Sequence, residues 1–247
     1  MSGGLTVLAR EQEAMFEVFR RHGKKGMRLL HVDQHCDMRG WVVDVEGRRA
    51  RWLRGCARLD SGNVLAHAVR EGWVTSVVWL HDPAVGRQAD IGTFLTVEEA
   101  GRWPWRWKTP GEDGGWSRFE LQEVTHVSRS SLEGVDALGL DWDHFAPFWC
   151  LEADARSRVE QFLGGISGPF PELIFMCASP GYASAHVGLF EELAGEVARR
   201  QGGTVERFDE PWGGVTGSGP SGRCLAAARR FARAGLVGLK RVVGVTG

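Results

Sequence analysis

The sequence has no long hydrophobic run and little cysteine. None of the apolar stretches in its 247 residues approaches the roughly 18 residues that span a bilayer, so we expect no membrane partner. The opening residues, MSGGLTVLAR, lack a basic segment followed by an apolar one, so no signal peptide is expected. Five cysteines are few and odd in number, which excludes a disulfide scaffold and favours reduced thiols in a cytoplasmic protein.

Net charge is also nearly absent. Lys and Arg total 30 and Asp and Glu total 31, which leaves a formal charge of −1. A nucleic-acid partner is not expected, because phosphate binding needs a strongly basic face. Hydrophobic residues at 43% and charged residues at 25% are ordinary for a globular protein. Since α/β domains of about 200–250 residues are common, we predict a single domain over residues 1–247.

Tryptophan and glycine are abundant, whereas tyrosine occurs once. The chain has 11 Trp, 34 Gly and one Tyr. Tryptophan often lines binding surfaces, but it fills cores equally well. The block Trp103-Pro104-Trp105-Arg106-Trp107 falls in a poorly patterned stretch, 81–117, which we interpret as an irregular excursion. This block could wall a peptide groove, seal a core or form a dimer interface, so a homo-oligomer stays open.

Apolar runs alternate with amphipathic segments along the chain. Residues 5–21 predict a helix, because Ala14, Met15, Val18 and Phe19 fall on one face. The predicted strands are 27–32, 41–45, 74–80, 119–127, 135–143 and 173–177, and the other predicted helices are 63–71, 152–163, 185–200 and 224–234, the last after a Gly/Ser loop at 213–222. This alternation predicts a three-layer α/β/α fold with a mainly parallel sheet.

The strongest chemical signal is Asp33-x-His35-x-Asp37, directly after the predicted strand 27–32. In an extended segment, side chains at i, i+2 and i+4 project to the same side. We therefore expect the three to converge at the carboxyl end of the strand, where open α/β sheets bind ligands. Two buried carboxylates are costly without a cation. On this motif alone, a metal site and a polar loop with capping aspartates are equally good interpretations.

A second strand also ends in carboxylates, at Asp141-Trp142-Asp143. If the two strands are neighbours, four carboxylates and one imidazole share one edge and need metal. Oxygen ligands with some nitrogen suit Mn²⁺, with Mg²⁺ or Fe²⁺ as alternatives. The number of carboxylates favours two ions over one, and two ions about 3.5–4 Å apart generate hydroxide from a bridging water at neutral pH.

The two motifs resemble the D-x-H-x-D and D-x-D metal signatures of the arginase and ureohydrolase superfamily. They look closest to the peptide arginases of ribosomal-peptide (RiPP) biosynthesis. The segments that carry the resemblance are 30–37 and 139–145, with weaker matches at Asn63 and at 179–182. The resemblance implies an arginase-like domain with two Mn²⁺ ions. It also implies that the enzyme converts arginine of a precursor peptide to ornithine and releases urea.

The resemblance assigns a role to each ligand. Asp33 and Asp141 match the carboxylates that bridge both ions, and His35 and Asp143 match ligands of one ion. Asp37 matches a ligand of the other ion. It also matches the carboxylate that passes a proton to the leaving nitrogen, so Asp37 is the expected catalytic residue.

The sequence departs from the superfamily pattern in three places. A Gly-Gly-Asp-His word is absent, and the peptide branch instead carries a histidine in its first helix. Glu11 falls at that position and could ligate as a carboxylate, whereas the adjacent Gln12 is a poorer ligand. The residues after the D-x-D word, 146–148, lack the usual Asp-Pro continuation, and the usual proton-shuttling histidine is missing. The last two departures disfavour free arginine or agmatine as substrate.

Four further residues are candidates for substrate binding. Glu191 and Glu192 could hold a guanidinium as a bidentate pair, or they could form a solvated helix face. Tyr182 lies in an expected edge loop, where function and packing are equally good interpretations. Asn63 could orient a ligand, although a helix cap is the simpler interpretation.

Two other functions stay open. The first is a metal-dependent amidohydrolase of the deacetylase kind, with one zinc held by two Asp and one His. The second is a metal-degenerate protein that binds a peptide in the old cleft, for which the lost histidine near Glu11 and Gln12 is the hint.

Overall fold

The fold is described from a computed structural model. The described residues are 4–38, 41–43, 49–52, 59–82, 95–96, 117–118, 120–124, 133–166 and 169–208. All of these described residues belong to one compact unit. The predicted loop 213–222, the predicted helix 224–234 and the tryptophan block 103–107 lie outside the described residues. The single domain over 1–247 therefore stays a prediction.

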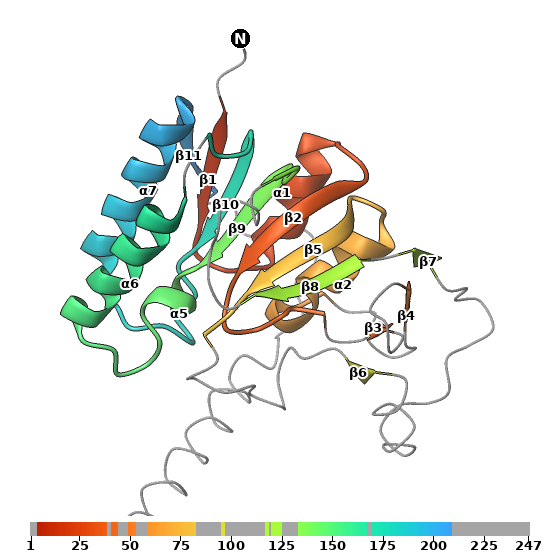
Figure 1. Ribbon diagram of the computed structural model, residues 1–247, viewed down its shortest axis with the longest axis horizontal. Helices are drawn as coiled ribbons and strands as arrows, with labels where there is room; N and C mark the ends of the chain where they lie inside the picture. Colours follow the sequence, from red (N-terminus) through yellow and green to blue (C-terminus); the bar gives the residue numbers. More distant parts are fainter. Residues whose placement is uncertain are drawn as a thin grey trace, which may run out of the picture. The chain divides into compact units, whose positions relative to one another are not determined.

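A parallel sheet is the framework of this unit (Figure 1). In the described part of the chain it has seven strands in the order β11-β1-β10-β9-β2-β5-β8, and each neighbouring pair is parallel. The strands are β1 (Leu5–Ala9), β2 (Met27–Val32), β5 (Val74–Leu80), β8 (Glu120–Val124), β9 (Ala137–Asp141), β10 (Leu173–Cys177) and β11 (Thr204–Phe208).

Helices cover both faces of the sheet. Helices α1 and α2 pack on one face, and α6 and α7 pack on the other (Figure 1). The described helices are α1 (Ala14–His22), α2 (Val64–Arg70), α5 (Trp142–Phe145), α6 (Glu152–Gly165) and α7 (Val187–Gln201), with a 3-10 turn η1 (Ser61–Asn63) before α2. None of these helices has the length and apolar character of a membrane span.

Successive residues of each central strand enter two different cores, as the strand period of two requires. In β2, Leu29 packs in the core beneath α1 and α2, which includes Met15. Its neighbour Leu30 packs in the opposite core with Phe162 of α6. Both leucines are fully buried. The three-layer α/β/α fold with a parallel sheet is thereby confirmed.

A second, smaller sheet lies in the middle of the chain. Its order in the described residues is β6-β3-β4-β7, and only the β3–β6 pair is parallel. The strands are β3 (Trp41–Val43), β4 (Arg49–Trp52), β6 (Leu95–Thr96) and β7 (Ser117–Arg118). Two of them fall within or at the edge of the stretch 81–117, which was expected to be irregular.

The helix predicted for residues 5–21 is wrong in its first half. Leu5–Ala9 forms strand β1, which pairs on both sides with β10 and β11. The short run LTVLA can form a buried strand as well as a helical turn, and only its neighbours decide between them. The predicted helical face is confirmed in α1, where Ala14, Met15, Val18 and Phe19 are buried. Strand β11 is mostly exposed and polar, and the sequence did not predict it.

We expect Leu138→Ala to lower the free energy of unfolding by about 2–5 kcal/mol, because it leaves a cavity in the core between the sheet and helices α6 and α7. Leu138 is fully buried in β9. The matched control is Val205→Ala on the edge strand β11, where the side chain is 44% exposed and the change should stay within about 0.5 kcal/mol. Urea unfolding measures both, and equal losses would contradict this account of the core.

Candidate metal centre

The predicted ligands follow two strands that are neighbours in the sheet. Strand β2 pairs with β9 in parallel, and the last matched pair is Val32 with Leu140. The next residue along the chain is an aspartate in both cases, Asp33 after Val32 and Asp141 after Leu140. The register therefore places both aspartates at the same step of the carboxyl edge, and the expectation that the two strands are neighbours is confirmed.

The D-x-H-x-D segment is bent, which corrects the expected extended conformation. Four extended steps of about 3.3 Å would separate the two ends of the motif by about 13 Å, too far for one ion. Residues 33–35 instead bend, and Asp37 adopts a left-handed backbone with φ 51°. Aspartate tolerates this region better than most residues. The bend lets the carboxylates of Asp33 and Asp37 approach the same imidazole, that of His31.

Backbone groups of the motif are anchored to neighbouring elements. The indole nitrogen of Trp79 donates a hydrogen bond to the Asp33 carbonyl at 3.0 Å. The amide of Ala66 in α2 donates to the Asp37 carbonyl at 3.2 Å. Strand β5 and helix α2 therefore hold the two ends of the bend.

The D-x-D segment also differs from the expected strand. Strand β9 ends at Asp141, and Asp143 lies in the short helix α5. The Asp141 carboxylate caps this helix, because its Oδ1 accepts a hydrogen bond from the Asp143 amide at 3.0 Å. Its Oδ2 accepts a second hydrogen bond, at 2.5 Å, from the Ser179 hydroxyl. The helical turn carries the Asp143 Oδ2 to 3.0 Å from His35 Nδ1.

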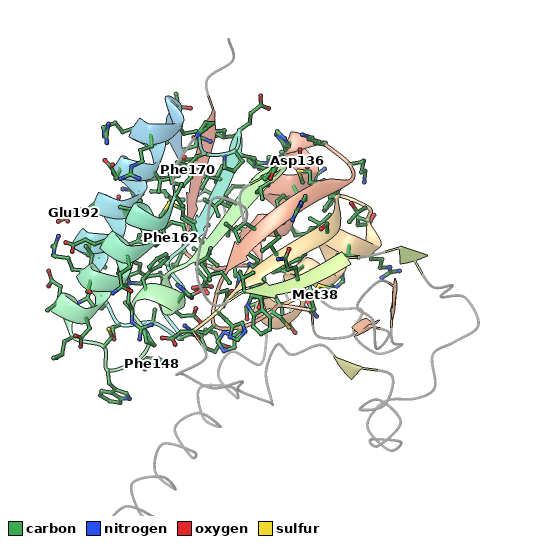
Figure 2. The ribbon with its side chains drawn as sticks, viewed as in Figure 1. Met38, Asp136, Phe148, Phe162, Phe170 and Glu192 are labelled. Atoms are coloured by element: carbon green, nitrogen blue, oxygen red, sulfur yellow. The ribbon has the colours of Figure 1, made fainter. Side chains whose placement is uncertain are left out.

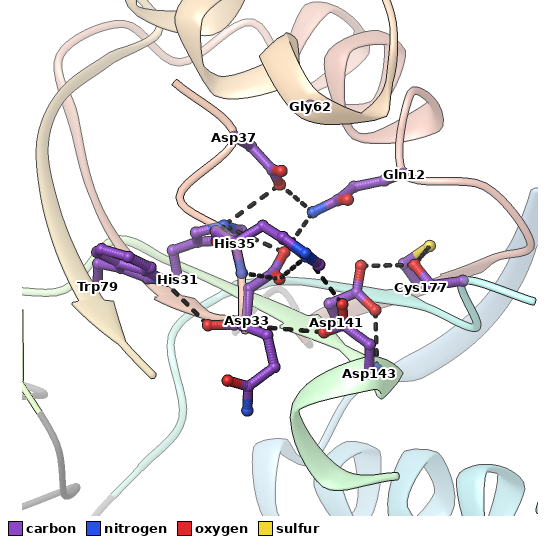
Figure 3. A network of polar contacts seen from close by, with 12 residues as sticks. Gln12, His31, Asp33, His35, Asp37, Gly62, Trp79, Asp141, Asp143 and Cys177 are labelled. Carbon is purple, nitrogen blue, oxygen red and sulfur yellow. Dashed lines mark hydrogen bonds and ion pairs between the residues drawn. The ribbon is translucent and has the colours of Figure 1, made fainter. Parts of the chain in front are cut away.

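Two sets of side chains in the described residues have the spacing of metal ligands (Figure 3). The first group is His31, Asp33 and Asp37, and the second group is Asp33, His35 and Asp143. Within each group, one ligand atom per residue lies within 4.8 Å of the others. Asp33 belongs to both groups, whereas Asp141 belongs to neither and lies beside them.

All four aspartates are removed from solvent. Their exposed fractions are 0% for Asp33, 1% for Asp37 and 3% for both Asp141 and Asp143. Burial and the charge of Asp33 raise the pKa of Asp37 well above its usual range. Burial and the charges of Asp143 and Asp33 do the same to the pKa of Asp141. Burial and Asp33 raise the pKa of Asp143 to about 6.

The two histidines of the cluster respond in opposite ways. Burial lowers the pKa of His31, so its imidazole is neutral. Burial opposes the charged form of His35 too, but hydrogen bonds to Asp143 and Asp33 raise its pKa to about 12. Burial alone would raise the pKa of Asp33, yet the hydrogen bonds and the charge of His35 lower it. Without a cation, this edge relies on protons and one imidazolium to offset its negative charge.

Gln12, rather than Glu11, reaches the cluster (Figure 3). The Gln12 amide donates hydrogen bonds to Asp33 Oδ2, at 2.7 Å, and to Asp37 Oδ2. Glu11 has a side chain that is 62% exposed, lies 3.6 Å from Arg10 and is in neither ligand group. The structure therefore brings the neighbour of the expected ligand into the cluster.

Of the four candidates for substrate binding, the structure ties Tyr182 to the cluster. Its ring centroid lies 5.7 Å from that of His35 in an edge-to-face arrangement. The Asn63 Oδ1 accepts a hydrogen bond from the Asp60 amide at 2.9 Å in a capping box, in which Asp60 is the N-cap of η1. Asn63 therefore supports the cap of the preceding turn, and its side chain does not cap α2 as the simpler interpretation expected. A role for either residue in binding substrate stays a prediction.

Glu191 and Glu192 already have arginine partners. Glu191 pairs with Arg207 at 2.7 Å, and Glu192 pairs with Arg156 at 2.9 Å. Glu192 lies on the side of α7 that points away from the sheet (Figure 2). The structure does not bring this pair to the two ligand groups.

Three contributors were missed from the sequence: His31, Ser179 and the contact made by Gln12. For His31, the signal was present, because it stands two residues before Asp33 and a strand places such residues on the same face. Its Nδ1 is buried without a hydrogen-bond partner. The other ring nitrogen, Nε2, faces the carboxylates of Asp33 and Asp37, and this donor set of oxygen and nitrogen fits a cation site.

We expect the metal-free fold to lose stability as the pH rises from about 7.5 to about 8.5. In this window the folded chain keeps the proton on His35, whose pKa is raised to about 12, whereas the unfolded chain has released it. The raised pKa values of Asp37 and Asp141 act in the same direction. Burial lowers the pKa values of His31 and His144, so in this window both side chains are neutral in the folded and the unfolded chain and do not contribute.

Melting temperatures measured across this window in chelator and in Mn²⁺ test this expectation. The chelated protein should melt at progressively lower temperature as the pH rises. The Mn²⁺ sample should show a flatter profile, because a bound cation replaces the protons. A melting temperature in chelator that is constant or rises over this window would contradict the assigned protonation states.

No protein-family model and no curated protein matches the chain. Similarity was found among solved structures. Proclavaminate amidino hydrolase from Streptomyces clavuligerus is similar with a TM-score of 0.39 and 13% identity, over 80% of this chain and 63% of that one. Arginase from Medicago truncatula is similar with a TM-score of 0.40 and 14% identity, over 80% of this chain and 58% of that one. The chain thus spans less than two thirds of either structure.

Proposed function

We propose that this chain is a dinuclear metal hydrolase that converts peptidyl arginine to peptidyl ornithine and releases urea. The observation that carries the proposal is the sharing of Asp33 by two ligand groups at the carboxyl edge of the sheet. A carboxylate that touches both groups can hold two ions a few ångströms apart, which is the arrangement of two-metal hydrolases.

The charge of the cluster supports two divalent cations rather than one. Asp33, Asp37, Asp141 and Asp143 are each at most 3% exposed, and their carboxylates carry four negative charges when ionised. Two divalent cations neutralise this charge, whereas a single ion leaves half of it buried and uncompensated. The mixture of carboxylate oxygen and imidazole nitrogen favours Mn²⁺, with Mg²⁺ or Fe²⁺ as alternatives.

The reaction adds water across one bond of the arginine side chain. When bound, the ions supply a water molecule activated at neutral pH. The oxygen bonds to the guanidinium carbon, the bond from that carbon to Nε breaks, and the Nε takes a proton. Asp37 is the residue we assign to deliver this proton, because the resemblance gives its position that role and its carboxylate belongs to the first ligand group. The products are urea and the primary amine of ornithine.

An exposed apolar loop supports a peptide as the substrate. Phe148, Trp149 and Leu151 follow the ligand-bearing helix α5 and are 52%, 92% and 68% exposed. A β-bridge between Pro147 and Ala183 ties this loop to the segment that carries Tyr182. Contiguous exposed apolar side chains are typical of interaction sites, so this loop offers contacts for residues that flank the arginine.

Two observations keep alternative functions open to test. Each ligand group has two aspartates and one histidine, the set that a one-zinc deacetylase needs. The Gln12 amide also satisfies the two carboxylates of the first group without metal, as a metal-degenerate binding protein would need. Metal analysis separates these functions: two Mn²⁺ ions support the proposal, one Zn²⁺ the deacetylase, and none the binding protein.

Incubation of the purified protein with Mn²⁺ and an arginine-containing peptide tests the activity. Each converted arginine loses CH₂N₂, a mass of about 42 Da, and releases one urea. A matched peptide with lysine in place of arginine has no guanidinium and should stay unchanged. An unchanged arginine peptide in the presence of a loaded metal centre would overturn the substrate assignment.

Two variants control this assay. Asp141→Asn should lose the activity, because it removes a carboxylate charge beside both ligand groups while it keeps the shape of the side chain. Glu196→Gln should keep full activity, since Glu196 pairs with Arg199 and Arg200 on the exposed face of α7.

We further expect Trp149→Ser to raise the KM for a peptide several-fold with little change in kcat. Trp149 is almost fully exposed, so its loss should leave the melting temperature unchanged while it removes apolar contact area for the peptide. Steady-state kinetics with long and short arginine peptides measure the effect. An unchanged KM for every peptide would exclude this loop from substrate binding.

A further inference from the structure

His31 occupies a position that is otherwise apolar. It lies in β2 between Leu30 and Val32, and all three side chains are fully buried. Strand periodicity gives His31 the same face as Asp33, one step deeper in the sheet. A polar side chain in such a place needs a partner that offsets its burial.

The distances around His31 are those of metal ligands. Its Nε2 lies 3.3 Å from Asp33 Oδ2 and 3.3 Å from Asp37 Oδ2. Two ligand atoms at right angles around an ion, with bonds of about 2.1 Å, stand about 3.0 Å apart. In the second group, His35 Nδ1 lies 3.0 Å from Asp143 Oδ2. His31 is therefore placed toward the first group as His35 is placed toward the second.

A purely structural role explains the surroundings of His31 less well. Its Nε2 lies 3.1 Å from the His35 carbonyl oxygen, which is within hydrogen-bond distance. The Nδ1 has no hydrogen-bond partner and faces Gly139, where an added Cβ would lie 3.5 Å away. A fully buried imidazole with one unpaired nitrogen is costly unless the other nitrogen makes a strong bond.

We propose that His31 binds the metal ion of the first group directly through Nε2, as a ligand outside the D-x-H-x-D motif. The inference deepens the proposed function and rests on its two-ion centre, but not on the identity of the substrate. His31 gives the first group one neutral nitrogen and two carboxylates, the same composition as the second group. Each ion then has one imidazole, and Asp33 contributes to both.

Metal stoichiometry tests the proposal. Wild-type protein titrated with Mn²⁺ should bind two ions, whereas His31→Asn should bind one ion tightly, with the affinity of the other site lowered at least about 100-fold. His35→Asn should also bind one ion, and the double variant none. His67→Asn is the matched control, because His67 is buried in α2, packs on Phe16 and lies in neither group. Two ions bound by His31→Asn with unchanged affinity would overturn the proposal.

A second measurement needs no variant and so does not depend on how His31→Asn folds. Wild-type protein with isotope-labelled histidines is loaded with Cd²⁺, and NMR detects spin coupling between the metal and directly bonded nitrogens. We expect two coupled histidines, one through Nε2 and one through Nδ1, because these are the atoms that face the two groups. Coupling through Nδ1 alone would overturn the proposal.

The outcomes separate this inference from the proposed function. Coupling to His31 Nε2 in a protein that leaves arginine peptides unchanged would support the inference and overturn the substrate. Conversion of the peptide by a protein in which His31 shows no coupling would do the reverse. A wild-type protein that binds no divalent cation would overturn both.

Discussion

The confinement of four carboxylates at one dry edge of the sheet is the constraint on which the rest of the structure depends. Asp33, Asp37, Asp141 and Asp143 are buried almost completely, and the charge of Asp33 raises the pKa of each of the other three. Such a cluster is expensive to fold without positive charge, because desolvation and repulsion act in the same direction. Much of the surrounding structure can be understood as the means of keeping these groups together.

The course of the backbone does much to bring the four aspartates together. Two parallel strands in register bring Asp33 and Asp141 to the same step of the edge, and each chain then leaves the sheet in a different way. After β2 the chain bends, and after β9 it starts a helix that the Asp141 carboxylate caps. Neither exit is extended, and this matters because an extended chain would carry alternate side chains away from a common point. Trp79 and Ser179 then fix the two aspartates from neighbouring strands and loops.

The sequence predicts the parallel sheet and the composition of the cluster, because both depend on local pattern. Continuous apolar runs indicate buried strands, and aspartates directly after two of them mark the edge. The sequence could not predict β1, since LTVLA becomes a strand only between β10 and β11. It also could not decide whether Glu11 or Gln12 faces the cluster. Adjacent residues of a turn or helix point in different directions, so a shift of one position decides which side chain lies in solvent and which lies in the cluster. The role of His31 was accessible from strand periodicity, but a histidine within an apolar run is more simply interpreted as core.

The first ligand group lacks the histidine that the resemblance expects, which raises the question of whether this group can still hold an ion. The resemblance places a histidine in the first helix, and here Gln12 faces the cluster from the segment just before α1. The Gln12 amide is a weaker ligand than a histidine, but both side chains are neutral. The negative charge that a cation would have to balance is therefore the same with either residue. His31 restores an imidazole from the opposite side of the same two carboxylates. Because both aspartates of the first group face His31, the proposed centre would keep one imidazole for each ion without the histidine that the resemblance places in the first helix.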